Sequence, residues 1–140
     1  MAASRVSGFP VIHGTLFDAG YPDSYFDEVH IIHMLEHVQD PKAVLCEAAR
    51  ILKPAGVLRI EVPNFRSVSR MLFGKNWKRL DAPRHLYHFT PHTLRLFLHQ
   101  SGFSNVAISG IASPKYFLQS FAFWRQGKTQ SYPRFVWYLF

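Results

Sequence analysis

Two short segments hold most of the side chains that could carry chemistry. The first spans residues 33–37 (HMLEH) and the second spans residues 84–88 (RHLYH). A histidine with its usual pKa of about 6.5 accepts or donates a proton near neutral pH. An arginine holds a carboxylate or a phosphate through paired hydrogen bonds. The two segments therefore offer proton transfer and anion binding.

The spacing of the histidines does not indicate a metal site. His30 and His33 are three residues apart, as are His85 and His88. On a strand the first two would point to opposite faces. Neither pair has a carboxylate–histidine set beside it with the spacing of metal ligands. We therefore predict no metal ion.

Strands are expected on both sides of the first segment. Residues 26–33 (FDEVHIIH) and 57–62 (VLRIEV) are apolar, β-branched runs bounded by turn-forming residues, a pattern typical of strands. In the second run apolar residues alternate with the charged residues Arg59 and Glu61, so one face of this strand is expected to be exposed to water. Shorter strands are expected at residues 9–13 and 106–109.

Two helices are expected between and after these strands. Asp40-Pro41 and Thr90-Pro91 each join an N-cap residue to a proline suited to the first helical turn. Residues 53–56 (KPAG) end the first helix, and Gly102 is the expected C-cap of the second. Strands that alternate with helices predict an α/β fold with a parallel sheet.

Composition indicates a folded chain of about one domain. The 140 residues are 48% apolar, and no stretch reaches the length of a membrane span or a signal peptide. A single cysteine, Cys46, favours the reducing cytoplasm. The net charge is +7, with the excess in residues 66–95, which form either a solvated face or a docking surface for an acidic partner. That stretch lacks a recognition helix and stacking aromatics, so nucleic-acid binding is not favoured.

Several motifs together resemble one enzyme family. Residues 26–29 (FDEV), 33–38 (HMLEHV) and 40–41 (DP) are similar to the FDvV…hvLEHv.dP signature of class I S-adenosylmethionine-dependent methyltransferases of the UbiE-like (type 11 and type 12) group. Residues 50–56 (RILKPAG) resemble the RvLKPGG turn of that group, with Ala55 in place of the first glycine. Further landmarks follow in the family's order: EVPN at 61–64, APRHL at 82–86 and SGF at 101–103.

The resemblance implies a doubly wound, Rossmann-like sheet of seven strands, the last antiparallel, with the cofactor across the carboxyl ends of the central strands. Residues 9–13 would be the third strand, 26–33 the fourth, 57–62 the fifth, and the last two would follow residue 103. We expect residues 1–110 to be the C-terminal part of a methyltransferase domain, with a partial sheet from the third strand onward and helices mainly on one face. Residues 111–140 are then an aromatic-rich tail, expected to be truncated.

The family's glycine-rich loop is missing from this sequence. That GxGxG loop follows the first strand and lets the backbone approach the cofactor, whereas Gly8, Gly14 and Gly20 are the only glycines before residue 26. Without the first two strands, the third strand loses contact with the rest and the fourth becomes a bare apolar edge. Such an edge favours pairing with another chain, so we expect low stability or self-association.

The resemblance assigns roles to individual residues. The expected cofactor contacts are Gly14, Thr15 and Leu16 at the adenine, and His33 and Met34 at the methionine end. The expected catalytic residues are His37 and His85, and the expected substrate-binding residues are Glu36, Arg84 and His88.

Structural alternatives remain open for these residues. Glu36 and His37 also suit hydrogen bonds to neighbouring backbone. Arg84 also suits a salt bridge with Asp81. Residues 14–16 also suit a plain turn: Thr15 stands where the family often has an aspartate, which weakens an adenine contact or passes it to Asp18.

The resemblance implies S-adenosylmethionine-dependent methylation of a small molecule or of a lipid- or sugar-linked acceptor. The complete enzyme would supply the cofactor loop, and this chain alone is expected to be inactive. The alternative is a non-catalytic, degenerate methyltransferase module that binds another protein, or a second copy of itself, through the bared edge. The aromatic tail suggests contact with a partner or with a membrane surface.

Overall fold

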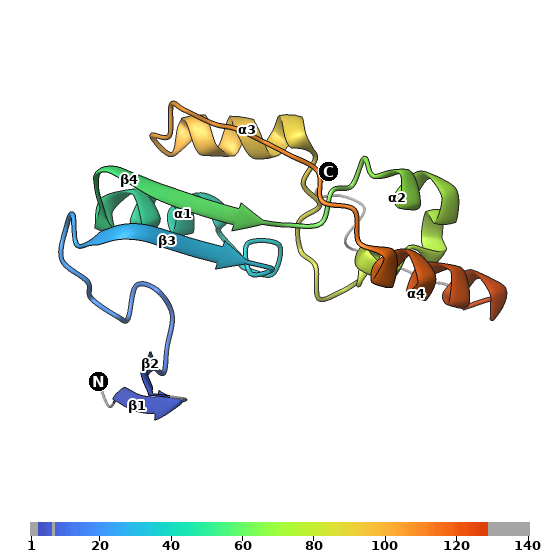
Figure 1. Cartoon of the computed structure of the whole chain (residues 1–140), viewed down its shortest axis with the longest axis horizontal. Coiled ribbons are helices and arrows are strands. Elements are labelled where there is room, and N and C mark those ends of the chain that lie inside the picture. Colours follow the sequence, from blue (N-terminus) through green and yellow to red (C-terminus); the bar gives the residue numbers. More distant parts are fainter. Residues whose placement is uncertain (1–2, 7, 129–140) are drawn as a thin grey trace.

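In the described part of the chain, two small sheets and four α-helices follow one another (Figure 1). The computed structural model describes residues 3–6 and 8–128. Its elements are β1 (Ala3–Val6), β2 (Phe9–Ile12), β3 (Phe26–Ile32), α1 (Pro41–Ile51), β4 (Leu52–Glu61), α2 (Val68–Phe73), the 3₁₀ turns η1 (Gly74–Asn76) and η2 (Lys78–Leu80), α3 (Pro91–Gln100) and α4 (Pro114–Arg125). None of the helices in this range is long and apolar enough to cross a membrane.

The strand–helix–strand unit β3–α1–β4 confirms the predicted parallel pairing. Val29 lies opposite Leu58, and Ile31 lies opposite Ile60. Helix α1 makes the crossover, and the Asp40 side chain accepts a hydrogen bond of 2.9 Å from the Ala43 N–H, as expected of an N-cap. Strand β4 begins directly after α1, five residues earlier than the apolar run indicates.

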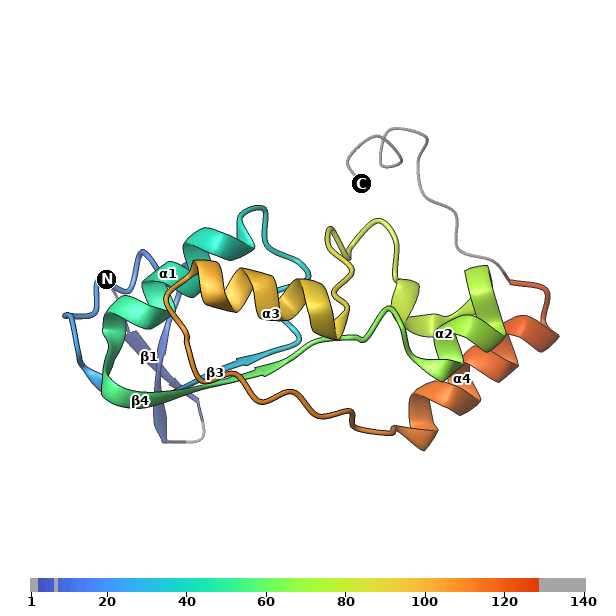
Figure 2. The ribbon, with the colours of Figure 1, turned by 90° about the horizontal axis from the view of Figure 1, so that it is seen from above.

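Helices α1 and α3 lie on the same side of this sheet (Figure 2), as the resemblance implies. Between the helices and the sheet lies the main core, made of Ile31, Leu35, Val44, Leu45, Ala48, Phe89, Leu94 and Leu98. Leu58 and Ile60 pack against this core, whereas Val57 and Arg59 are exposed. The wet face predicted from the alternation in β4 is therefore present.

The first two strands form a hairpin of their own. Strands β1 and β2 pair antiparallel, with Val6 opposite Phe9, and the hairpin stands apart from β3 and β4 (Figure 1). A strand at residues 9–13 is thus confirmed, but its place as a third parallel strand is wrong. The difference follows from the predicted loss of contact between the third strand and the rest of the sheet. Because no strand lies between β2 and β3, the backbone N–H and C=O groups of β2 form their hydrogen bonds with the adjacent β1.

The expected strand at residues 106–109 does not form. Residues 103–113 have no regular structure, and α4 follows where the last two strands were expected. Four residues next to Gly110 have no ladder partner within the described range, so nothing fixes them as a strand. The residues 135–140 of the aromatic tail lie outside the described range, and the division at residue 110 stays a prediction.

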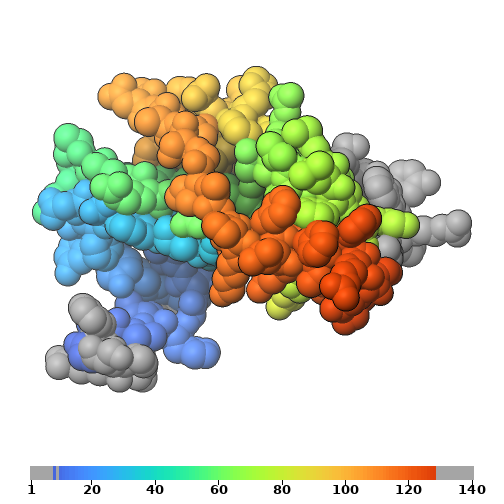
Figure 3. All heavy atoms as spheres, turned by 45° about the vertical axis from the view of Figure 1, so that its right-hand side comes forward, coloured from blue at the N-terminus to red at the C-terminus, as the bar shows by residue number. Residues whose placement is uncertain are grey.

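Helix α4 packs on a second, smaller core. Phe73, Trp77 and Leu80 from α2, η2 and the turn between them form that core. Ser120 of α4 is fully buried; its hydroxyl accepts from the Lys78 N–H at 3.0 Å and donates to the Tyr116 carbonyl at 2.8 Å. In the space-filling view α4 lies against the α2 region at the surface (Figure 3).

Candidate active site

The two chemically active segments of the sequence meet in the structure. The N–H groups of Leu86 and Tyr87 donate hydrogen bonds of 2.8 and 3.2 Å to the carbonyl oxygen of Glu36. The His33 N–H donates to the carbonyl of Glu61 at 2.9 Å, which fixes the start of the first segment at the carboxyl ends of β3 and β4. This is the edge of a parallel sheet at which ligands bind.

Glu36 is the most deeply buried polar residue of this site. Its side chain is 1% exposed, and neither carboxylate oxygen has a hydrogen-bond partner within residues 3–6 and 8–128. The nearest ring nitrogens are His33 Nδ1 at 3.5 Å and His85 Nε2 at 3.9 Å from Oε1. A buried carboxylate without hydrogen bonds is costly, so this group is poised to bind a donor or a cation.

His37 and His85 are oriented by backbone carbonyls. Nδ1 of His37 lies 2.9 Å from the Arg84 carbonyl, and Nδ1 of His85 lies 2.9 Å from the Arg79 carbonyl. A carbonyl only accepts, so each Nδ1 carries the proton and each Nε2 keeps a lone pair. The two rings meet edge to face with centroids 4.6 Å apart. Burial lowers the pKa of His85, against the opposing charge of Glu36.

His33 is held by residues that sequence reasoning did not select. Arg79 Nη2 lies 2.9 Å from His33 Nε2, and the Arg79 guanidinium lies 3.6 Å from the ring centre of Tyr116. A Glu61 oxygen lies 3.1 Å from the same nitrogen. The backbone of His33 has a φ of +48°, an uncommon value outside glycine. Glu61 stands at the end of the strand next to β3, and this position in the sequence could have identified it as a partner of His33.

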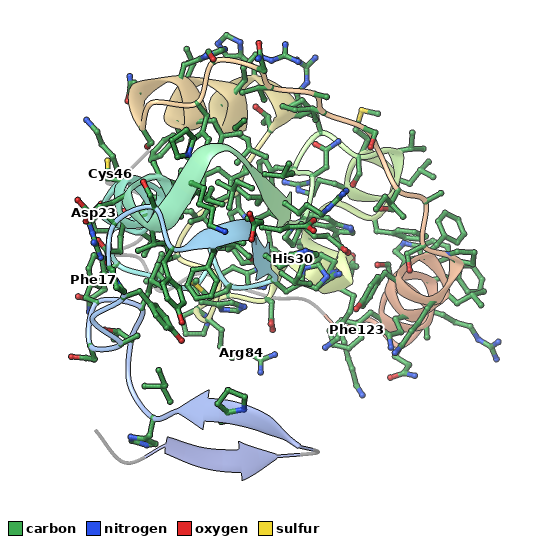
Figure 4. All side chains as sticks on the ribbon, turned by 60° about the vertical axis from the view of Figure 1, so that its left-hand side comes forward. Phe17, Asp23, His30, Cys46, Arg84 and Phe123 are labelled. Carbon is green, nitrogen blue, oxygen red and sulfur yellow. The ribbon has the colours of Figure 1, made fainter. Side chains whose placement is uncertain are left out.

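Arg84 forms the salt bridge that was the structural alternative. Its Nη2 lies 2.6 Å from Asp81 Oδ2, and this hydrogen bond raises the pKa of Arg84. The side chain extends outward from the molecule (Figure 4). Its main-chain carbonyl, in contrast, orients His37, so within this chain Arg84 contributes to the site through its backbone. A role of its side chain in substrate binding stays a prediction.

His88 stacks on Phe65 with ring centroids 4.8 Å apart. Burial, with smaller contributions from His85 and Arg70, lowers the pKa of His88 to about 4. The ring is therefore neutral at pH 7. Its centroid lies 6.1 Å from that of His85, so His88 is a neighbour of an expected catalytic residue, and its role in substrate binding stays a prediction.

Residues 14–16 lead into a turn at residues 16–19, and their contact with an adenine ring stays a prediction. The backbone N–H and the hydroxyl of Thr15 donate to Asp18 Oδ2 at 2.8 and 2.7 Å. These hydrogen bonds lower the pKa of Asp18 and use one oxygen of its carboxylate. Leu16 and Met34 both pack against the main core. A cavity of about 240 Å³ is lined by Leu16, Tyr21, Phe26, Glu28, Val29, His30 and Ile51.

Comparison with known proteins identifies the family. The sequence profile of a methyltransferase domain matches residues 2–108. The chain belongs to this methyltransferase family. A ubiquinone biosynthesis O-methyltransferase of Idiomarina loihiensis is 31% identical over 93 residues, or 61% of this chain and 38% of that protein. A demethylmenaquinone methyltransferase of Lysinibacillus sphaericus is 35% identical over 78 residues, or 49% of this chain and 33% of that protein.

A solved structure supports the fold. The methyltransferase chain resembles a possible histamine N-methyltransferase of Thermotoga maritima, with a TM-score of 0.57 and 26% identity over 66% of this chain and 44% of that one. That protein is described as a SAM-dependent methyltransferase. The chain is therefore part of an α/β, Rossmann-like methyltransferase domain. It spans less than half the length of the relatives that it matches.

The cofactor of this family is S-adenosylmethionine, and the described residues do not provide a complete site for it. The sequence contains no GxG, so no glycine turn lets the backbone approach a nucleotide closely. Gly14, one of the expected adenine contacts, faces Asp18: a Cβ built there would lie 3.0 Å from Asp18 Cβ.

Proposed function

We propose that this chain forms the acceptor side of an S-adenosylmethionine-dependent methyltransferase. The observation that carries the proposal is the meeting of Glu36, His37 and His85 at the carboxyl ends of β3 and β4. The acceptor is a small molecule or a lipid- or sugar-linked compound. The names of two relatives, which refer to ubiquinone biosynthesis and demethylmenaquinone, favour a quinone-type acceptor with a ring hydroxyl or carbon to be methylated.

In this proposal His37 removes the acceptor's proton. Its side chain is exposed, its Nδ1 is held by the Arg84 carbonyl, and its Nε2 lone pair is free to accept a proton from a hydroxyl group. His85 is buried against it and, being neutral, does not repel the imidazolium that forms. Glu36, 3.9 Å from His85, adds a negative charge that stabilises that cation.

The proposal includes weak cofactor binding by the 140 residues alone, because the glycine loop is absent from them. Calorimetric titration of the purified chain with S-adenosylmethionine is expected to show no saturable binding up to about 1 mM. Saturable binding in the micromolar range would overturn this part of the proposal.

A chimaera tests the acceptor side directly. The N-terminal strands and glycine loop of the Idiomarina loihiensis relative are fused in front of residue 9, and methyl transfer to a phenolic quinone precursor is measured with labelled cofactor. Transfer is expected, with a loss of 10²–10⁴-fold in H37A. H92A is the matched control, because His92 is an exposed histidine on α3. A chimaera that binds cofactor but has equal activity with H37A would contradict the role of His37.

A non-catalytic interaction module is the second candidate function. Tyr25, Ile32 and Val57 along the β3–β4 sheet are 54%, 49% and 47% exposed. Apolar surface beside the outer edge of a two-stranded sheet favours pairing with a second copy of the chain. Sedimentation is expected to show a dimer for the chain and a monomer for I32K. L96K, on exposed α3, is expected to remain a dimer; a chain that is monomeric at about 100 μM would exclude this candidate.

Contact with a membrane surface is the proposal for α4. Leu118, Phe121 and Trp124 are exposed on this helix, and basic residues lie at both of its ends, at Lys115, Arg125 and Lys128. Apolar side chains beside cations suit an anionic bilayer surface. Co-sedimentation with phosphatidylglycerol vesicles is expected for the chain and is expected to be lost in L118E/W124E. If L118E/W124E sedimented with the vesicles as well as the wild-type chain does, α4 would be excluded as the membrane-contacting element.

A further inference from the structure

The Glu36–His37–His85 cluster has the composition of a metal site. Each residue offers one ligand atom, and the three atoms lie within 4.8 Å of one another. We propose that this cluster binds one divalent transition-metal ion of the zinc class. The binding needs only residues of this chain and does not depend on the proposed methyl transfer.

The orientation of the two histidines is the first argument. In proteins, a histidine that binds a metal through one nitrogen usually donates its other N–H to a carbonyl or carboxylate. His37 and His85 both do so, through Nδ1 to the carbonyls of Arg84 and Arg79, at 2.9 Å in each case. Each ring therefore keeps an Nε2 lone pair whose direction is fixed before a metal arrives.

The state of Glu36 is the second argument. Its side chain is 1% exposed, and within the described part of the chain both of its oxygens lack a hydrogen bond. The two arginines of this region are already engaged, Arg84 with Asp81 and Arg79 with His33. A cation between the ligand atoms would compensate the buried carboxylate, which no described side chain does at hydrogen-bond distance.

The distances allow a metal with small side-chain adjustments. Metal–nitrogen and metal–oxygen bonds of about 2.1 Å put the ligand atoms of a tetrahedral site about 3.4 Å apart. His85 Nε2 and Glu36 Oε1 are 3.9 Å apart, and all three ligand atoms lie within 4.8 Å of one another, so the ligand atoms have to approach one another by at most about 1.4 Å. The segments that carry the ligands are already joined by the Leu86–Glu36 hydrogen bond of 2.8 Å.

The ligand set selects the kind of metal. Two imidazoles and one carboxylate suit zinc and the neighbouring transition metals, whereas magnesium and calcium prefer oxygen ligands. Three protein ligands leave at least one coordination position open. If the proposed function holds, a metal ion on His37 Nε2 occupies the lone pair that accepts the proton in the metal-free site. In the metal-bound form the open position would then face the acceptor, and a hydroxyl bound there would lose its proton to solvent more readily.

The proposal departs from the expectation of no metal for a reason of topology. Glu36 and His37 are adjacent, but His85 is 48 residues further along the chain. Only the fold brings it to them. Sequence spacing detects ligand pairs on one element and does not detect a third ligand delivered by another segment.

The test is a metal titration of the full 140-residue chain, tag-free and stripped with a chelator. It is done in a C46S background, because Cys46 is an exposed thiol on α1 (Figure 4) that could bind metal by itself. Calorimetry with Zn²⁺ and visible absorption with Co²⁺ are expected to show one site with a Kd of about 10 μM or tighter. Millimolar Mg²⁺ is expected not to compete.

Single variants decide whether these residues form the site. E36Q and H37Q are each expected to weaken binding at least tenfold, whereas H92Q, an exposed histidine on α3, is expected to leave it unchanged. His37 is itself exposed, so H37Q retains the fold, as circular dichroism will verify. Absence of a saturable site, equal competition by Mg²⁺, or wild-type affinity in E36Q and H37Q would overturn the proposal. The titration contains neither cofactor nor acceptor, so its outcome is independent of the chimaera assay.

Discussion

The amide of Leu86 donates a hydrogen bond of 2.8 Å to the carbonyl oxygen of Glu36. The two residues are far apart in sequence, and this bond fixes the distance between the two segments of the site. His37 and His85 stand one residue from either end of it. The position of each imidazole therefore depends on a main-chain contact and not on the identity of the side chain of Leu86, which is 42% exposed.

Replacing Leu86 by proline is expected to separate the two segments. Proline has no N–H to donate, so L86P leaves the buried Glu36 carbonyl with one donor fewer and is expected to lower the free energy of unfolding by about 2 kcal/mol. L86A keeps the N–H and is expected to cost less than about 1 kcal/mol. Urea denaturation followed by circular dichroism measures both. Equal losses would show that the side chain, and not the amide, holds the segments together.

The stability of the chain is expected to fall in mild acid because of His88. Burial holds the pKa of His88 at about 4, below its ordinary value of 6.5, so the unfolded chain takes up this proton first. The contribution of neutral His88 to the free energy of unfolding is therefore fully present above pH 6.5, and it is lost as the pH falls towards 4. Because the ring is only partly buried, we expect an effect of the order of 1 kcal/mol.

The variant H88F isolates this effect. Phenylalanine keeps the stack on Phe65 and cannot be protonated, so its unfolding free energy is expected to vary less between pH 6.5 and 4 than that of the wild-type chain. H92Q removes an exposed histidine of α3 and serves as the control. If H88F and the wild-type chain show parallel pH curves from urea denaturation, the acid sensitivity arises elsewhere.

The sequence predicted the β3–α1–β4 unit well because its signals are local. Asp40 caps α1 and the apolar runs form β3 and β4, each decided by neighbours within a few residues. The carboxyl-end rule for parallel sheets then places residues 33–37 at a site. The family resemblance assigned roles to residues 33–37 and to residues 84–88, and the structure shows the hydrogen bonds that join the two segments.

The parts that sequence reasoning missed depend on long-range partners. Strand β2 pairs with β1 because its parallel neighbours are absent, and residues 106–109 form no strand for lack of a partner. The pairing of Arg79 with His33 joins residues 46 positions apart. No periodicity encodes such a contact, so it becomes visible only when the elements are packed.

Two adjacent residues at the start of β4 are expected to respond in opposite ways to substitution. Ala55 has a φ of +65°, which costs about 1 kcal/mol for a residue with a Cβ, so A55G is expected to raise the free energy of unfolding by about 0.5–1 kcal/mol. The family turn that this segment resembles has glycine there. A decrease in A55G would mean that the flexibility that glycine gives the unfolded chain outweighs the relieved strain.

The opposite result is expected at Gly56. A Cβ added there would lie 2.9 Å from the Lys53 carbonyl oxygen and 3.1 Å from the Asp27 carbonyl oxygen. These are backbone atoms that cannot turn aside as a side chain can, so G56A is expected to lower the free energy of unfolding by about 1–3 kcal/mol. The same denaturation series measures both variants, and a G56A chain as stable as the wild type would show that β3 and β4 adjust freely at this end.

Ser120 is expected to hold α4 on the smaller core. Its hydroxyl accepts from the Lys78 N–H and donates to the Tyr116 carbonyl, and it is fully buried. S120A leaves the Lys78 N–H without this partner, which is expected to cost about 1–3 kcal/mol. Because α4 packs mainly on α2, η1 and η2, the loss is expected to appear as faster amide exchange in residues 114–125 with little change in β3. S113A, at the start of α4 where the side chain makes no capping hydrogen bond, is the matched control. Equal acceleration of exchange in β3 and in α4 would instead show that the two cores unfold as one unit.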